Sequence, residues 1–170
     1  TVFYAPALVT GVARSEDNGQ TWEGPLNNPP GEKDGNWGHT WLWRDPVTGR
    51  LFFTLYNSFA GPCFGGTGHN AWFSADDGSS WTELDKGIGC NSWDWGKIVT
   101  GPARRTETQK RLDESGYPNV VYFCAGGPTY AIGPNHFCYR SVDGGKTYER
   151  TKSDAIDATR GEMGWPNAGY

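Results

Sequence analysis

Two carboxylates close to tryptophans are the residues of this sequence best suited to acid–base chemistry. Asp94 stands in the run Trp93-Asp94-Trp95, and Glu162 precedes Trp165 by three residues. Hydrolysis of a glycosidic bond uses a pair of carboxyl groups, one as the acid and the other as the nucleophile or base, at a defined separation. The sequence does not give that separation, so it offers Asp94 and Glu162 as candidates and leaves the catalytic residues unknown.

Three other aspartates belong to one repeated motif, S-x-D-x-G-x-[ST]-[WY]. Its copies are Ser15–Trp22, Ser74–Trp81 and Ser141–Tyr148. Copies about sixty residues apart indicate an array of similar supersecondary units. A short carboxylate in a turn accepts hydrogen bonds from backbone N–H groups, and the glycine allows a positive φ. We therefore expect a structural role for Asp17, Asp76 and Asp143. The spaced carboxylates ending in glutamate that form a calcium loop are missing, so no metal site is predicted.

The residues around each copy are typical of short strands joined by turns. The second repeat predicts strands over 39–44, 51–57, 69–74 and 81–84. The third repeat predicts strands over 97–100, 119–124, 136–140 and 148–151. The first repeat is incomplete, with strands over 1–5 and 11–15. The insertion Gly101–Pro118 carries four basic residues that are diluted by Glu107, Asp113 and Glu114, so it is expected to be a solvated loop, with an anion-binding patch as the alternative. The chain shows no convincing helical periodicity.

Four short antiparallel strands in each repeat predict an all-β fold, a β-propeller of four-stranded blades. All 170 residues are expected to belong to one propeller domain. It divides into a partial blade 1–35, blades 36–93 and 94–161, and the start of a further blade at 162–170. Propellers close with about four to eight blades. These two and a half blades are therefore expected to be a fragment of a six- or seven-bladed propeller, or to close by assembly with further copies.

The repeated motif resembles the Asp-box, or bacterial neuraminidase repeat, of secreted bacterial sialidase-like β-propellers. In that family, ligands bind the rim opposite the Asp-boxes, and the resemblance implies the same rim here. Aromatic rings stack on the CH faces of sugars while polar groups bind the hydroxyls, so a carbohydrate ligand is expected. Packing between blades is an alternative for Trp95, and strand capping is one for His69 and His136. The residues that strand order assigns to the ligand rim are His39, His69, Trp93, Trp95, Lys97, Tyr130, His136 and Trp165.

The resemblance implies a secreted sialidase-like propeller. Hydrolysis of extracellular glycans is one function that this family would predict, but the resemblance leaves enzymatic activity uncertain. Sialidases bind the substrate carboxylate with an arginine triad and carry an Arg-Ile-Pro element, which this chain lacks. The visible arginines are expected on the opposite rim. A noncatalytic extracellular propeller that binds glycan or protein at a cell surface is therefore an alternative. A polysaccharide lyase is another, with which His136 and Tyr130 are compatible.

Composition and cysteine positions limit the setting and the partners. A net charge of −4 predicts no nucleic-acid binding, and no apolar run approaches a membrane span. No cofactor is predicted. Neighbouring strands should bring Cys124 to Cys138, and loops on one rim should bring Cys63 to Cys90. Two disulfides would indicate an extracellular or periplasmic location, and free thiols in the cytosol are the alternative.

Overall fold

The computed structural model describes residues 1–4, 12–24, 26, 40–55, 70–84, 94–126 and 136–151. These ranges contain ten strands and one helix. The elements are β1 (Val2–Tyr4), β2 (Ala13–Ser15), β3 (Thr40–Arg44), β4 (Leu51–Leu55), β5 (Asn70–Ser74), β6 (Thr82–Glu83), β7 (Asp94–Gly101), α1 (Thr106–Ser115), β8 (Val120–Gly126), β9 (His136–Ser141) and β10 (Glu149–Arg150).

The strands form antiparallel sheets in which each strand pairs with its neighbour in the chain. One four-stranded sheet has the order β3-β4-β5-β6, and the other has the order β7-β8-β9-β10. Strands β1 and β2 pair in a two-stranded sheet. The ten strands coincide with those predicted from the sequence, with small shifts at their ends; β7, for example, begins at Asp94 instead of Lys97. The described part of the chain is therefore predominantly β, as predicted.

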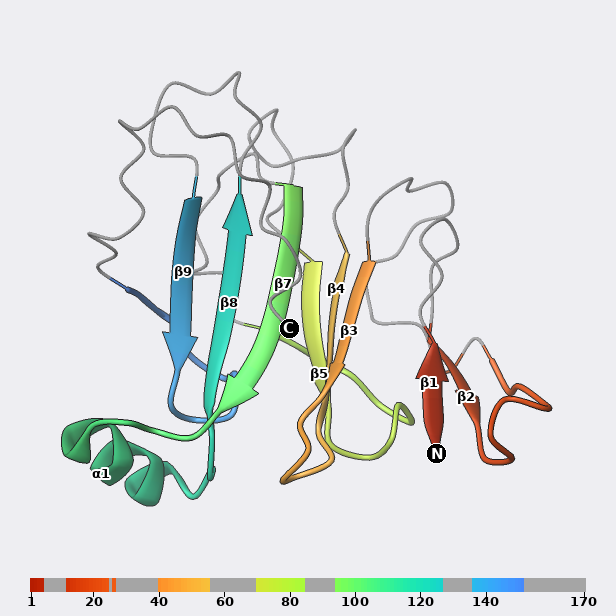
Figure 1. The fold of residues 1–170 in the computed structure, drawn as a ribbon, viewed down its shortest axis with the longest axis horizontal. Helices are drawn as coiled ribbons and strands as arrows, with labels where there is room; N and C mark the ends of the chain where they lie inside the picture. The colour runs from red at the N-terminus through yellow and green to blue at the C-terminus, as the bar shows by residue number, and fades with distance from the viewer. Residues whose placement is uncertain are drawn as a thin grey trace.

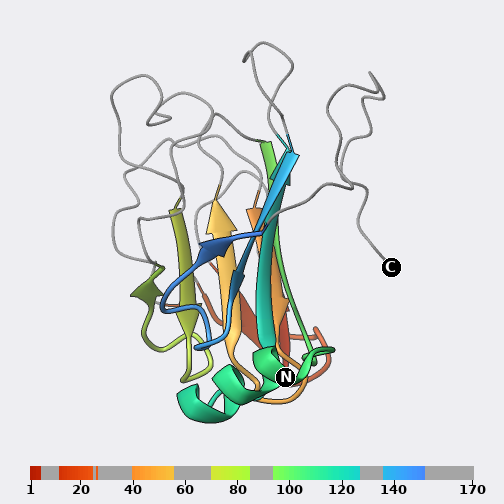
Figure 2. The ribbon, with the colours of Figure 1, turned by 90° about the vertical axis from the view of Figure 1, so that its left-hand side faces the viewer.

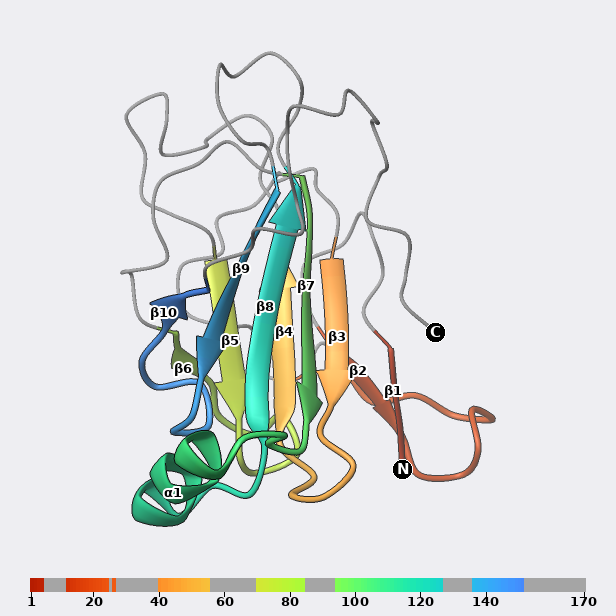
Figure 3. The ribbon, with the colours of Figure 1, turned by 60° about the vertical axis from the view of Figure 1, so that its left-hand side comes forward.

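The three sheets lie side by side, with β7–β9 on the left of Figure 1, β3–β5 in the middle and β1–β2 on the right. Three kinds of connection share the lower end of that view: the β3–β4 hairpin, the turns that contain the repeated motif, and helix α1. Figures 2 and 3 show the same arrangement from two other sides. We call the lower end in Figure 1, where the turns of the repeated motif lie, the Asp-box end of the sheets.

The middle sheet is buried on both faces. Phe52 and Phe73 belong to a core shared with Ile98, Val121 and Phe123 of the β7–β10 sheet. On the other face, a second core contains Val12, Leu51, Phe53, Trp72 and Trp81. Burial on both faces explains why Leu51–Leu55 is an almost continuous apolar run instead of an alternating one. Each fully buried phenylalanine contributes roughly 1.5–3 kcal/mol of stabilisation, so these contacts hold the sheets together.

The prediction of a solvated loop at Gly101–Pro118 was wrong, because its central part forms helix α1. Only Thr108 and Leu112 of this helix are buried. Leu112 packs against Val120 and Val142. One buried leucine produces too narrow an apolar stripe to be recognised as helical periodicity in the sequence. The helix ends at Gly116, which has a φ of 73° and donates its backbone N–H to the carbonyl of Leu112.

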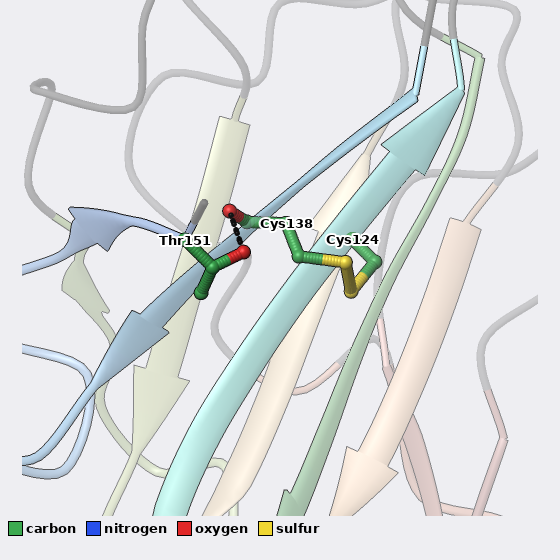
Figure 4. Close-up of a disulfide and its surroundings, with 3 residues drawn as sticks. All are labelled: Cys124, Cys138 and Thr151. Carbon is green, nitrogen blue, oxygen red and sulfur yellow. Dashed lines mark hydrogen bonds between the residues drawn. A yellow bond between two sulfur atoms is a disulfide. The ribbon is translucent and has the colours of Figure 1, made fainter. Parts of the chain in front are cut away.

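The disulfide Cys124–Cys138 is formed, as predicted (Figure 4). The two cysteines are direct partners in the register of β8 and β9. Thr151, which follows β10, donates its hydroxyl to the carbonyl of Cys138 on β9 at 2.9 Å. The predicted pair Cys63–Cys90 lies outside the described residues. In the described ranges, no helix is long and apolar enough to cross a bilayer.

Replacing both Cys124 and Cys138 with alanine should destabilise the protein. The disulfide joins residues 14 positions apart. Cross-linking a loop of this length lowers the conformational entropy of the unfolded chain, which stabilises the folded state by about 3 kcal/mol. We expect the free energy of unfolding to fall by about 2–3 kcal/mol in denaturant titrations followed by tryptophan fluorescence. The difference between variant and wild type should disappear under reducing conditions. Equal stability of the two oxidised proteins would contradict the prediction.

Candidate functional site

The three Asp-box turns share one hydrogen-bond pattern. In the second turn, the Ser74 hydroxyl donates to Oδ1 of Asp76 at 2.8 Å and accepts the backbone N–H of Gly78 at 2.8 Å. The backbone N–H of Ser80 donates to Oδ1 of Asp76, and the Ser80 hydroxyl donates to Oδ2 at 2.6 Å. The same bonds link the corresponding residues of the first and third turns, around Asp17 and Asp143. Each aspartate therefore uses both carboxylate oxygens to hold its own turn.

These bonds stabilise the ionised aspartates. The hydroxyl and backbone N–H of Thr21, followed by the Ser15 hydroxyl, lower the pKa of Asp17 to about 2. Hydrogen bonds from the hydroxyl and backbone N–H of Ser80, followed by the Ser74 hydroxyl, lower the pKa of Asp76 below its ordinary value. Burial, the largest single effect on Asp143, raises its pKa, but hydrogen bonds from Ser141 and Thr147 outweigh it and the pKa is lowered. A general acid must be protonated near the working pH, so these three carboxylates are poorly suited to that role.

The aromatic residue that ends each Asp-box has a different environment in each copy. Trp81 is buried, and its ring lies 6.1 Å from that of Phe53. Trp22 is 46% exposed. The Tyr148 hydroxyl is buried and makes no hydrogen bond within the described residues. Burial, the largest effect, raises the pKa of Tyr148, with a further contribution from the charge of Asp143. The turns are thus locally equivalent and differ in what packs against them.

A buried carboxylate links the β3–β4 hairpin to the neighbouring sheet. Asp45 has no exposed surface. It accepts hydrogen bonds from the Tyr117 hydroxyl, from Nδ2 of Asn119 at 2.8 Å and from the backbone N–H of Val47 at 2.9 Å. Burial, the largest effect, raises the pKa of Asp45, but these bonds together with one from Thr48 outweigh it and lower the pKa. The cluster is a satisfied polar network that joins two sheets.

Arg50 completes this network between the hairpin and the third Asp-box. Its guanidinium lies 4.5 Å from the ring centre of Phe73 and 4.8 Å from that of Tyr117. It donates from Nη1 to the carbonyl of Gly144 at 2.7 Å. Gly144 has a φ of 76°, and a Cβ there would overlap the Arg50 guanidinium and come within 2.8 Å of Tyr117. Only glycine therefore fits this close approach without strain.

Few of the residues predicted for the ligand rim lie in the described ranges. Asp94 and His136 occupy the same level of the β7–β10 sheet, because both pair with Gly126 in register. This level is at the end of the sheet away from the Asp-boxes. Trp95 also belongs to β7. The other predicted residues lie outside the described residues; they are His39, His69, Trp93, Tyr130, Glu162 and Trp165.

Lys97 is the one predicted rim residue whose side chain is described. Its ammonium lies 5.1 Å from the ring centre of Trp41, a cation–π distance. Trp41 also donates its indole N–H to the carbonyl of Ile98 at 2.8 Å, and Trp43 donates to the Thr100 hydroxyl at 3.0 Å. No role for Trp41 or Trp43 is predicted from the sequence. The two tryptophans are two positions apart in the run Thr40–Arg44, and this spacing predicts that both lie on the same face of a strand.

The described residues contain no group of three or more histidine, cysteine or acidic side chains that could hold a metal ion. Comparisons with protein-family models, with curated proteins and with solved structures found no match to the chain.

The lowered pKa values predict that the fold loses stability in acid. A carboxylate with a lower pKa in the folded than in the unfolded state stabilises the fold above its ordinary pKa, near 3.8 here. That contribution is lost as the pH falls through the lowered value. We expect the Tm to be nearly constant from about pH 7 to pH 5 and to fall below about pH 4.

Substitution of Asp76 with asparagine isolates one of these carboxylates. Asparagine retains an acceptor oxygen but does not titrate, so D76N should be less stable at neutral pH by about 1 kcal/mol. Its Tm should also fall less steeply in acid than that of the wild type. Thermal unfolding at a series of pH values measures both. Parallel Tm profiles for the two proteins would show that Asp76 does not contribute to acid sensitivity.

Substitution of Tyr117 with phenylalanine tests the buried network. It removes a donor from Asp45, and a buried carboxylate that loses a hydrogen bond costs about 1–3 kcal/mol. The matched control is Tyr122→Phe, because the Tyr122 hydroxyl has no hydrogen bond within the described residues. We expect Y117F to lower the free energy of unfolding and Y122F to leave it within about 0.5 kcal/mol of the wild type. Equal effects of the two substitutions would mean that the Asp45 bond is not important for stability.

Proposed function

We propose that this chain is part of an extracellular Asp-box β-propeller of the sialidase-like type that hydrolyses glycans. The observation that carries the proposal is the recurrence of one hydrogen-bonded Asp-box turn at the same end of neighbouring antiparallel sheets. The blades of a propeller are four-stranded antiparallel sheets, so the two four-stranded sheets support the proposal. The strands β3–β6 fall within the blade predicted over 36–93, and β7–β10 fall within that over 94–161.

Contacts between the first strands of the two sheets support this assignment. The indole groups of Trp41 and Trp43 reach from β3 to the backbone and side chains of β7. In a propeller the first strand of each blade lines the central channel, so β3 and β7 would be the channel strands. The disulfide Cys124–Cys138 supports an oxidising extracellular or periplasmic compartment.

The ligand face of such a propeller would be the end opposite the Asp-boxes, where Asp94 and His136 share a level of the sheet. In this proposal Asp94 and Glu162 are the candidates for the two carboxyl groups of a hydrolase, and Trp93, Trp95 and Trp165 would stack on sugar rings. His39, His69, Lys97, Tyr130 and His136 would supply polar contacts to hydroxyl groups. The required separation of the two carboxyl groups depends on the mechanism. It is shorter in enzymes that retain the configuration of the anomeric carbon and longer in enzymes that invert it.

A noncatalytic glycan- or protein-binding propeller is the second candidate, and the placement of the arginines favours it. A sialidase needs arginines that converge on the substrate carboxylate at the ligand face. Within the described ranges, most arginines instead lie in or beside the connections at the Asp-box end. These are Arg14, Arg44, Arg50, Arg104, Arg105, Arg111 and Arg140.

Glycan binding and hydrolysis by the purified protein would test both candidates. A glycan array measures binding, and chromogenic glycosides, sialosides included, measure hydrolysis. For a cleaved substrate, Asp94→Asn should lower kcat/KM by at least about 100-fold. The matched control is Asp77→Asn at the Asp-box end. Asp77 has a φ of 54°, and asparagine already occupies the corresponding position as Asn18, so D77N should keep the fold and the activity.

The outcomes separate the two candidates. Hydrolysis that is lost in D94N and kept in D77N supports the hydrolase. Glycan or protein binding that D94N weakens, without cleavage of any glycoside, supports the noncatalytic propeller and rejects the hydrolase. Absence of both binding and hydrolysis would reject a glycan function altogether.

A further inference from the structure

We infer that a second site, an arginine-lined pocket at the Asp-box end, binds a tetrahedral oxyanion of the sulfate or phosphate type. The pocket has a volume of about 340 Å³ and lies between the β7–β9 strands and the start of α1. Its walls include Arg104, Arg105, Thr108, Tyr122 and Arg140. It is at the opposite end of the sheets from Asp94 and His136, so the inference does not depend on the proposed glycan function.

The pocket collects positive charge from two separate parts of the chain. Arg104 and Arg105 lie in the connection from β7 to α1, and Arg140 lies on β9, the third strand of the sheet. Within the described residues, neither Arg104 nor Arg105 has an ion pair or side-chain hydrogen bond. The side chain of Arg140 donates from Nε to Glu149 at 2.6 Å. That bond fixes the orientation of its guanidinium and leaves the two terminal nitrogens free to donate to a ligand.

None of the three acidic residues of the insertion lines this pocket, although Glu107 lies in the first turn of α1. Asp113 accepts a hydrogen bond from Gln109 at 2.8 Å, and Glu114 pairs with Lys110 at 3.9 Å. Both carboxylates lie in the second half of α1, while Arg104 and Arg105 precede its first turn. Glu149 is shared between Arg140 and Arg111, so its single negative charge is balanced by two guanidinium groups. The sequence places these acids near the arginines, but the helix separates them.

The start of α1 adds to the positive potential. Arg105 is the N-cap residue, and its side chain makes no capping hydrogen bond. The carbonyl of Arg105 accepts the backbone N–H of Gln109 at 3.0 Å, the first bond of the helix. The N–H groups of the first turn precede that bond and have no helical acceptors. Thr108, in this first turn, is one of the residues that line the pocket. An anion there would interact favourably with the helix dipole.

The combination of groups favours a tetrahedral anion over a carboxylate. A planar carboxylate presents two oxygens and is satisfied by one arginine fork, whereas a sulfate or phosphate ester presents three terminal oxygens. Three guanidinium groups from two directions match that number. Tyr122 and Thr108 line the same pocket, and each carries a hydroxyl of the kind that can donate to further lone pairs. The same chemistry would bind a free inorganic ion or an ester group on a larger molecule.

Titration of the protein with inorganic sulfate and with inorganic phosphate tests the site, with sodium chloride at matched ionic strength as the control. Calorimetry gives the affinity, and NMR of the arginine Nε–H groups identifies the arginines that respond. Arg105→Ala and Arg104→Ala should each weaken binding by at least about tenfold, the loss expected when a charged hydrogen-bond donor is removed. Lys110→Ala makes the same charge change on the exposed side of α1 and should leave the affinity within about twofold.

A second pair of probes distinguishes the sources of the anion. A sulfated oligosaccharide and its desulfated form are compared with free sulfate. If the ester is the natural ligand, the sulfated oligosaccharide should bind at least about tenfold more tightly than free sulfate, and the desulfated form should not bind. Comparable affinities for free sulfate and the sulfated oligosaccharide would identify a free-ion site.

Two results would overturn the inference. The first is equal loss of binding in K110A and R105A, which would indicate a diffuse charge effect and no defined site. The second is absence of saturable binding of sulfate, phosphate and the sulfated oligosaccharide, as expected if another part of the protein covers the pocket.

Discussion

Asp45 is ionised and has no exposed surface, so its burial imposes a strict requirement on the surrounding structure. A carboxylate removed from water must receive hydrogen bonds from its surroundings, or its desolvation outweighs the packing around it. One hydrogen bond is local and comes from the backbone N–H of Val47. Two others come from the side chains of Tyr117 and Asn119, which lie more than seventy positions further along the chain. The network therefore forms only when the β3–β4 hairpin lies against the start of β8. It couples the polar end of the interface to the apolar core that Phe52, Phe73 and Phe123 form between the same sheets.

The Asp-box turns meet a similar requirement over a much shorter distance. Each carboxylate finds its donors within four residues, so the turn is complete without help from the rest of the protein. The third turn is then also used as a tertiary contact, because its Gly144 carbonyl accepts from Arg50 of the neighbouring sheet. A rigid local turn that offers a backbone carbonyl in a fixed position is well suited to that purpose. The Asp45 network and the third Asp-box are thus connected through Arg50 and Tyr117 at this end of the sheets.

The two ends of the sheets consequently have different chemistry. The Asp-box end contains saturated carboxylates, stacked guanidinium groups and a pocket beside α1. Two arginines of that pocket, Arg104 and Arg105, have no ion pair within the described ranges. The opposite end brings Asp94 and His136 to one level of the β7–β10 sheet. Rigid stacked sheets keep these ends apart, so ligands at the two ends would not compete directly. The same stacked sheets would carry both of the proposed sites.

Sequence reasoning succeeded where the governing interactions are local or periodic. The strands follow from apolar runs such as Leu51–Leu55, the Asp-box turns from residues within eight positions, and the pair Cys124–Cys138 from adjacent strands. It failed for α1, whose packing depends on one leucine, and it assigned no role to Trp41, Trp43, Asp45 or Tyr117, because their partners lie in another sheet. The arginines of the insertion show the same division. Their charges and the nearby acids are evident in the sequence, but only the helix separates Arg104 and Arg105 from Asp113 and Glu114. The sequence by itself determined the strands, the turns and one disulfide, since each depends on neighbours along the chain or on adjacent strands. The tertiary structure alone decided which polar groups meet between sheets and which arginines have no acidic partner among the described residues, because both depend on contacts between segments far apart in the chain.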